Sequence, residues 1–199
     1  MRKGCFCCLL GLLLLVMWVL AQFTGALAPA VSQVLVLSDD DYPVMDSPTI
    51  SAAFIDRVLS AYGSPAAGTG QALYDLGVQA GIDPVYALAF FLHEDSFGET
   101  GIGAVNHSLG NIRCSAGYRC QGGFRSYTSW ADGYRDWYAL ILDGYVHGQV
   151  TGSLVGHACT TVGQIVPVYA PSRDHNSVAG YITAVEHAVD TWRCGRMWV

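Results

Sequence analysis

The spacing of apolar residues predicts a chain built mostly of helices. Between Phe54 and Leu59, apolar side chains recur every three or four positions, which indicates an amphipathic helix over residues 51–62. The same spacing returns further along the chain. It predicts more helices over residues 71–80, 129–146, 161–168 and 177–192.

One segment, residues 82–98, differs from these helices because it is apolar on nearly every side. Asp83 can cap a helix there, and Pro84 falls at the first helical position, where its missing N–H costs nothing. Residues 85–92 are apolar, as expected for a helix buried in a core. Polar residues then return, and Gly98 is the expected stop. We therefore expect a buried central helix around which the domain packs.

Glu94 lies in the last turn of this predicted helix, a position that disfavours a negative charge. The C-terminal end of a helix carries partial negative charge, and apolar surroundings penalise ionisation. Both effects are expected to raise the pKa of Glu94, as a general acid working near neutral pH requires. The alternative is an exposed glutamate at a helix end with no role in chemistry.

The remaining segments between the helices are predicted to be loops. Residues 98–123 are rich in glycine and lack periodicity, and segments 111–113 and 123–125 could pair as a minimal β-hairpin. Residues 29–50 are interpreted as a linker, and their acidic run as a solvated turn rather than a calcium site. The predicted domain then covers residues 51–194, with a mostly α fold and a small hairpin.

The N-terminus has the layout of an export signal. Arg2 and Lys3 precede an apolar run over residues 5–21, and Ala26-Leu27-Ala28 follows as a small-x-small cleavage site. A signal peptide over residues 1–28 is one interpretation. The apolar run also approaches the roughly 17–25 residues that span a bilayer, so an uncleaved membrane anchor is the alternative. Both predict an extracytoplasmic protein, either secreted or attached to the cell membrane by this segment.

Length and charge narrow the class of protein further. The 199 residues suit one domain with a sizeable core. The formal net charge is −6, and cleavage after Ala28 would make it −8, because Lys+Arg falls from 10 to 8 against 16 acids. Nucleic acids and anionic membrane surfaces are therefore poor partners for the domain.

Four cysteines lie outside the leader, at positions 114, 120, 159 and 194. An even number in an exported chain suggests two disulfides, and three pairings are formally possible. A bond between Cys114 and Cys120 would close a short loop, leaving Cys159 and Cys194 to tie the final helix down. A zinc site is the alternative, but the spacing matches no common zinc pattern.

Several familiar motifs are incomplete in this chain. His93-Glu94 lacks the second histidine, four residues on, that a thermolysin-type zinc helix needs. No Gly-x-Ser-x-Gly sequence is present, which weakens the case for an α/β hydrolase. Gly98, Gly101 and Gly103 follow no strand and do not complete a phosphate-binding fingerprint. No metal or cofactor is therefore expected.

Three sequence segments carry a resemblance to a known family. ALAFFLHEDSFG, followed by NHSLGNIR, matches a helix that ends in glutamate and leads to an Asn turn, through Ala89, Glu94, Ser96, Gly98, Asn111, Ile112 and Arg113. FRSYTSWADGYRDWYALI matches a second segment through Phe124, Arg125, Tyr127 and Ser129. YAPSRDHNSVAGYI matches a third through Tyr169 and Tyr181. Together, over about residues 51–193, they resemble the glucosaminidase family of cell-wall hydrolases, glycoside hydrolase family 73.

This resemblance implies both a fold and an activity. The fold would be lysozyme-like, and the activity would be hydrolysis of the β-1,4 bond after N-acetylglucosamine in the glycan strands of peptidoglycan. Glu94 would be the general acid. The resemblance also implies substrate-binding roles for Asn111, Tyr127, Tyr169 and Tyr181.

The chain departs from the family at one point, because residues 111–129 contain no Asp or Glu where many members place a second carboxylate. Hydrolysis by two carboxylates needs such a group on the other face of the sugar. The candidates elsewhere are Glu99, Asp132 and Asp174. Alternatively, the acetamido group of the substrate attacks the anomeric carbon, oriented by Asn111 or Tyr169.

Three other functions stay open beside hydrolysis. A lytic transglycosylase would need only one glutamate. A non-catalytic glycan-binding module on the same fold would keep the aromatic residues of the groove and would need no acid. A cell-wall amidase would need a metal or a nucleophile, and the sequence offers no clear candidate for either.

Overall fold

The computed structural model describes residues 42–149 and 157–199. The predicted signal peptide or anchor, residues 1–28, lies outside these ranges, as does most of the predicted linker. Within the described ranges, no helix is long and apolar enough to cross a membrane. All described residues belong to one structural unit.

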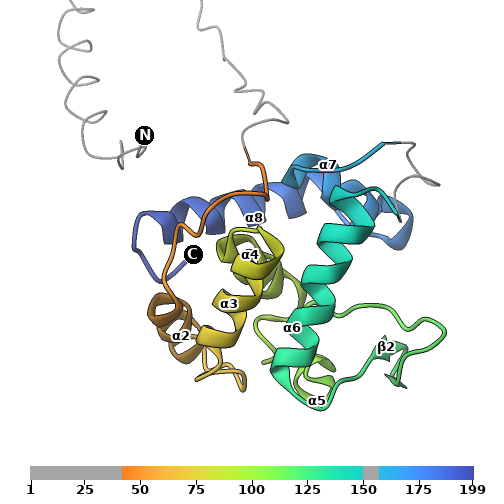
Figure 1. Ribbon diagram of the computed structural model, residues 1–199, viewed down its shortest axis with the longest axis horizontal. Coiled ribbons are helices and arrows are strands. Elements are labelled where there is room, and N and C mark those ends of the chain that lie inside the picture. Colours follow the sequence, from red (N-terminus) through yellow and green to blue (C-terminus); the bar gives the residue numbers. More distant parts are fainter. Residues whose placement is uncertain (1–41, 150–156) are drawn as a thin grey trace, which may run out of the picture. The chain divides into compact units, whose positions relative to one another are not determined.

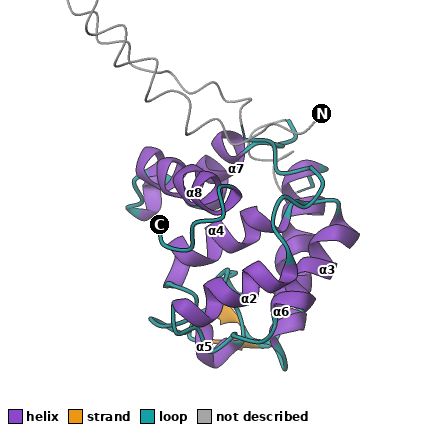
Figure 2. Cartoon of the chain, turned by 90° about the vertical axis from the view of Figure 1, so that its left-hand side faces the viewer, coloured by secondary structure: helices purple, strands orange, loops and turns teal. Residues whose placement is uncertain are grey.

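This unit is mostly helical with one small hairpin, which confirms the predicted fold class at that level (Figure 1). The α-helices are α2 (Ala52–Ala61), α3 (Gly70–Ala80), α4 (Pro84–Asp95), α5 (Gly103–Asn106), α6 (Trp130–Ala139), α7 (Val162–Tyr169) and α8 (Val178–Arg193). Two further segments are a π-helix, η2 (Leu140–Val146), and a 3-10 turn, η4 (Ser172–Asp174). The strands are β1 (Cys120–Gln121) and β2 (Phe124–Arg125), the only sheet in the described ranges (Figure 2).

Helix α4 is the buried central helix that the sequence predicts. The Asp83 side chain accepts the N–H of Val85, and Pro84 occupies the first turn. Every residue from 84 to 91 is buried, because α4 packs against α3 and α8, while Phe90 and Phe91 contact Trp137 of α6. Figure 1 shows α4 surrounded by these helices. Burial on all sides holds the end of α4, where the candidate acid lies, in a fixed place.

Residues 42–50 correct the predicted linker, because they pack against the domain. Val44 is buried, its N–H donates to the carbonyl of Thr160, and its own carbonyl accepts the N–H of Asp83. These bonds add an extended segment alongside the start of α4. This segment could not be predicted, because it is too short to show a periodic pattern. The domain therefore begins before residue 51.

The hairpin also differs from the prediction in its pairing. The expected strands were 111–113 and 123–125, but β2 pairs mainly with β1, in the register Cys120 with Arg125. The expected partner contributes only a single bridge, Arg113 with Phe124. Strand β2 therefore pairs with β1 and also forms one bridge to Arg113. The prediction included the bridge partner but not β1.

The disulfide prediction is half right. Cys114 and Cys120 are bonded, and they close the loop that leads into β1. No bond joins Cys159 to Cys194 in the described ranges. Their settings differ, since Cys159 is fully buried beside Tyr145 while Cys194 caps the end of α8 in a partly exposed position. A count of cysteines cannot reveal such a difference.

Candidate functional site

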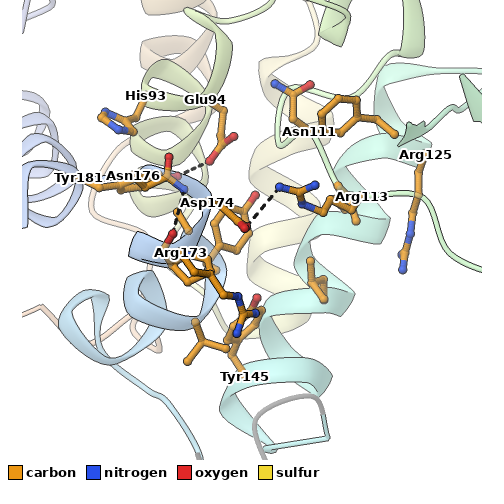
Figure 3. A pocket seen from close by; sticks show the side chains of 17 residues that line it. His93, Glu94, Asn111, Arg113, Arg125, Tyr145, Arg173, Asp174, Asn176 and Tyr181 are labelled. Atoms are coloured by element: carbon orange, nitrogen blue, oxygen red, sulfur yellow. Dashed lines mark hydrogen bonds and ion pairs between the residues drawn. The ribbon is translucent and has the colours of Figure 1, made fainter. Parts of the chain in front are cut away.

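A cavity of about 590 Å³ opens beside the C-terminal end of α4. Its walls come from α4, the loop after α5, η2, the end of α7, the η4 turn and the start of α8. Figure 3 shows the side chains that line it. Segments spread between residues 93 and 181 therefore meet at the end of the central helix.

Glu94 lies in the wall of this cavity with its carboxyl half-buried. The hydroxyl of Tyr181, from α8, donates to Glu94 Oε1 at 2.6 Å (Figure 3). Burial raises the pKa of Glu94, and the bond from Tyr181 opposes part of that rise because a donor favours the charged carboxylate. Glu94 forms no ion pair among the described residues. The arrangement favours a neutral carboxylic acid that can give up a proton.

Tyr181 is itself held rigidly by aromatic packing. Its ring centre lies 5.6 Å from that of Phe90 and 3.9 Å from that of His93, and the residue is almost fully buried. Burial also lowers the pKa of His93, which favours its neutral form at the cavity edge. Because Tyr181 is itself held in place, its hydrogen bond to Oε1 fixes the orientation of the Glu94 carboxyl.

Tyr169, at the end of α7, forms another part of the wall. Its hydroxyl donates to the carbonyl of Gly110 at 2.6 Å and accepts the indole N–H of Trp137 at 3.2 Å. Residue 110 must be glycine, because a Cβ there would overlap the indole ring of Trp137. Both hydrogen bonds of the Tyr169 hydroxyl are therefore made within the protein, and they join the loop at Gly110 to the core. The ring of Tyr169 is the part of the side chain that can contact a ligand.

Asn111 is the residue after Gly110, and it also lines the cavity. Its backbone is left-handed, with φ of 42°, a conformation that asparagine tolerates better than most residues. Its Oδ1 atom is buried and has no hydrogen-bond partner among the described residues. Buried acceptors are normally paired, so this atom is an exception among the buried groups beside the cavity.

Charged groups line another part of the cavity. Arg113 donates to Asp174 Oδ2 at 3.2 Å, joining the loop after Asn111 to the η4 turn. Both side chains are open to solvent, at 78% and 37% exposure. Arg173 and Arg125 also line the cavity, the latter while paired with Asp136 at 2.7 Å. The part of the cavity lined by Arg113 and Asp174 is polar and exposed to solvent, whereas the part around Glu94 is packed against aromatic rings.

The structure brings four of the five predicted site residues together. Glu94, Asn111, Tyr169 and Tyr181 all line the cavity. Tyr127 is the exception, because its hydroxyl donates to Asp136 beneath the hairpin and the residue lies outside the cavity lining. Its predicted contact with substrate has no support in this arrangement.

The three candidates for a second carboxylate also separate. Glu99 is exposed on the loop near Gly63, away from the cavity lining. Asp132 accepts bonds from Ser129 and Arg135 at the start of α6. Asp174 alone among them lines the cavity.

Asp95 is not among the predicted site residues, yet it lies next to Glu94. It is almost fully buried, its Oδ1 accepts the N–H of Gly98 at 2.8 Å, and its Oδ2 has no partner among the described residues. Burial raises the pKa of Asp95 to about 7, and the charge of neighbouring Glu94 adds to the rise. The carboxyl lies against Gly103, where any side chain would overlap it. Asp95 therefore joins the end of α4 to the following loop.

The chain turns sharply after Asp95. Ser96 and Phe97 have positive φ values of 53° and 58°, which strain residues other than glycine, and Gly98 continues the turn. The side chain of Phe97 is fully buried against Tyr62, which holds the strained turn in place. The helix therefore ends at Asp95, three residues before the predicted stop and immediately beyond the candidate acid.

Comparisons with known proteins add no relative. No protein-family model matches the chain, and no curated protein matches it significantly. In the described ranges, no group of three or more His, Cys, Asp or Glu side chains is placed to hold a metal ion. The interpretation of the site therefore depends on its own geometry, which offers a buried acid, an unpaired amide oxygen and an Arg-paired carboxylate around one cavity.

Proposed function

We propose that this protein is a glycoside hydrolase that cleaves the β-1,4 bond after N-acetylglucosamine in peptidoglycan glycan strands. Glu94 is its general acid. The observation that carries the proposal is the position of Glu94, in the wall of a cavity, with its pKa raised by burial and its carboxyl oriented by Tyr181. A neutral carboxylic acid held in this way is the group that protonates a departing glycosidic oxygen.

The geometry of the carboxyl suits one direction of proton transfer. Oε1 accepts the hydroxyl of Tyr181, which leaves Oε2 to hold the proton. As the bond between the anomeric carbon and the glycosidic oxygen breaks, that oxygen takes the proton from Glu94. The bond from Tyr181 then stabilises the carboxylate that forms, because a donor favours the charged form.

The rest of the cavity suits an N-acetylated sugar. Its volume lies within the range of roughly 300–1,000 Å³ that small-molecule sites occupy. The partly exposed ring of Tyr169 provides apolar surface for a sugar face. Asn111 lines the same cavity, and its side-chain amide is the candidate partner for an acetamido group, which unsubstituted sugars lack.

Two further features support an extracytoplasmic site of action. The bond between Cys114 and Cys120 is typical of proteins that fold in an oxidising compartment. The sequence of residues 1–28 has the layout of an export signal or anchor. A mostly helical fold with a small hairpin also agrees with the lysozyme-like fold that the sequence resemblance implies.

A turbidity assay tests the acid directly. The purified full-length chain is expected to clear a suspension of peptidoglycan, and Glu94→Gln is expected to lower the rate about 10²–10⁴-fold, because glutamine has the shape but no proton to give. Glu99→Gln is the matched control, since Glu99 is exposed and lies outside the cavity lining. Circular dichroism should be unchanged in both variants. Equal activity of Glu94→Gln and Glu99→Gln would remove Glu94 from the mechanism.

Mass spectrometry of the released fragments separates this function from the alternatives. Hydrolysis gives reducing sugars that end in N-acetylglucosamine. Anhydro-sugars would instead identify a lytic transglycosylase, and free peptides would identify an amidase. Intact walls that nevertheless retain the protein in a pull-down would identify a non-catalytic glycan-binding module.

A further inference from the structure

The cavity is lined by two carboxylates among the described residues, Glu94 and Asp174. They come from distant parts of the sequence, one from the end of α4 and the other from the η4 turn between α7 and α8. Figure 3 shows the carboxylate of Asp174 directed at the guanidinium of Arg113. The fold therefore places a second acidic group where residues 111–129 supply none.

These two carboxylates have opposite surroundings. Glu94 contacts a hydroxyl and apolar rings, and it forms no ion pair among the described residues. Asp174 contacts the guanidinium of Arg113 and is 37% exposed, so bulk water reaches it. Two carboxyl groups held in such different settings suit two different roles in proton transfer.

We propose that Asp174 is the general base of this reaction: it takes a proton from the water molecule that attacks the anomeric carbon. The inference rests on the function proposed above. The water oxygen forms a bond to the anomeric carbon as the bond from that carbon to the glycosidic oxygen breaks. Glu94 gives a proton to the departing oxygen and Asp174 receives one from the water, so no other reactant is needed.

Exposure favours this role over direct attack by Asp174. A nucleophilic carboxylate must touch the anomeric carbon, whereas a base needs room for water between itself and the sugar. Asp174 lies at the solvent-open side of the cavity, on a turn whose residues are exposed, and its carboxylate is held by Arg113. The expected product therefore has inverted configuration at the anomeric carbon.

The other nearby acids do not meet the same conditions. Asp136 is engaged by Arg125 and by Tyr127 beneath the hairpin, and it does not line the cavity. Asp95 is buried behind the end of α4, against Gly103, and does not line the cavity either. Asp174 is thus the group that the geometry assigns to the water.

Asp174→Asn tests the assignment in the full-length chain, acting on soluble glycan strands released from peptidoglycan by removal of their peptides. The rate is expected to fall about 10²–10⁴-fold, the usual contribution of a general base. Asp143→Asn is the matched control, because Asp143 is exposed on η2 and, among the described residues, its side chain pairs with His147 alone. The control should keep full activity, and circular dichroism should be unchanged in both variants because both side chains are open to solvent.

Two further readouts separate a base from a residue that merely supports the loop. Proton NMR of the fresh wild-type product should show the inverted anomer. Sodium azide should restore part of the rate of Asp174→Ala, with formation of a glycosyl azide, because azide is a nucleophile that needs no deprotonation. Azide should leave Glu94→Gln unrescued, because that variant lacks the acid.

The outcomes distinguish this inference from the function on which it rests. If the wild-type chain cleaves glycan and Asp174→Asn cleaves it equally well, the assignment of Asp174 is wrong and the function stands. A product of retained configuration, or an anhydro-sugar, also overturns the role of Asp174 as the base for water. If the wild-type chain releases no sugar, the proposed function fails and the assignment fails with it.

Discussion

The two sides of the cavity are built in different ways. The buried wall, defined here as Glu94, Tyr169 and Tyr181, stands on helices α4, α7 and α8 and is backed by the aromatic core. The exposed wall, defined as Arg113 and Asp174, stands on a loop and a single 3-10 turn and faces solvent. The comparison shows that the side chains around Glu94 are held by packing, whereas Asp174 is held by one ion pair.

This difference has a physical reason. A raised pKa requires removal from water, and only a packed core removes a carboxyl from water reliably. A carboxylate that must stay charged and reach water gains nothing from burial, since burying it would cost free energy. The two walls should therefore respond differently to mutation.

The largest effect on stability is expected behind the buried wall. Phe90 is fully buried, and its ring packs on Tyr169 and Tyr181 with ring centres 5.4 and 5.6 Å apart. Phe90→Ala should lower the free energy of unfolding by about 3–5 kcal/mol and abolish activity, because both supporting rings lose their contact. Denaturant unfolding followed by fluorescence measures the change.

The matched control for Phe90→Ala is an exposed apolar residue. Val78 is 50% exposed on α3, and Val78→Ala should change stability by no more than about 0.5 kcal/mol. If Phe90→Ala were as mild as the control, the view that packing holds the buried wall would be wrong.

A smaller effect is expected on the exposed side. The bond between Cys114 and Cys120 closes a short loop directly after Arg113. Replacing both cysteines by serine should lower the free energy of unfolding by roughly 2 kcal/mol, through the greater freedom of the unfolded chain. Helix content should stay the same, because the bond lies at the surface. A reducing agent should lower the melting temperature of the wild-type chain to that of the double variant. It should leave the melting temperature of the double variant unchanged.

The smallest change in structure should give a clear change in pH dependence. Tyr181→Phe removes one hydroxyl and should cost about 1 kcal/mol of stability. The bond from Tyr181 lowers the pKa of Glu94, so its loss raises that pKa further. A general acid is active while protonated, and the alkaline limb of the pH–rate profile should therefore move to higher pH. Tyr145→Phe, which lines the same cavity without bonding Glu94, should leave that limb in place.

The sequence alone predicts the buried wall better than the exposed one. Glu94 could be found because its signals are local: Asp83 and Pro84 start the helix, an apolar run follows, and polarity returns at the helix end. Tyr169 and Tyr181 came from the family resemblance, and both line the cavity. Most helix bounds were predicted within a few residues for the same reason, since periodicity is local.

The exposed wall could not be predicted because its contacts are long-range. Arg113 and Asp174 are 61 positions apart, and neither lies in a periodic segment. Asp174 was only one of three candidates until the fold separated them. The pairing of Cys159 with Cys194 failed similarly, because the distance between two cysteines in space is not encoded in their number. The docking of Val44 and the engagement of Tyr127 by Asp136 also depend on where distant elements come to rest.

Asp95, the buried carboxyl beside Glu94, makes the stability of the fold depend on pH. Its pKa rises from 3.8 to about 7 on burial, so the chain takes up a proton as it folds at any acidity between these values. The stability that this uptake contributes is complete below pH 3.8 and is lost as the pH climbs to 7. In more alkaline surroundings, the folded chain carries a charged oxygen with no partner among the described residues. Asp95 should therefore make the folded chain more stable in acidic than in alkaline media, and denaturant unfolding measured on both sides of pH 7 tests this.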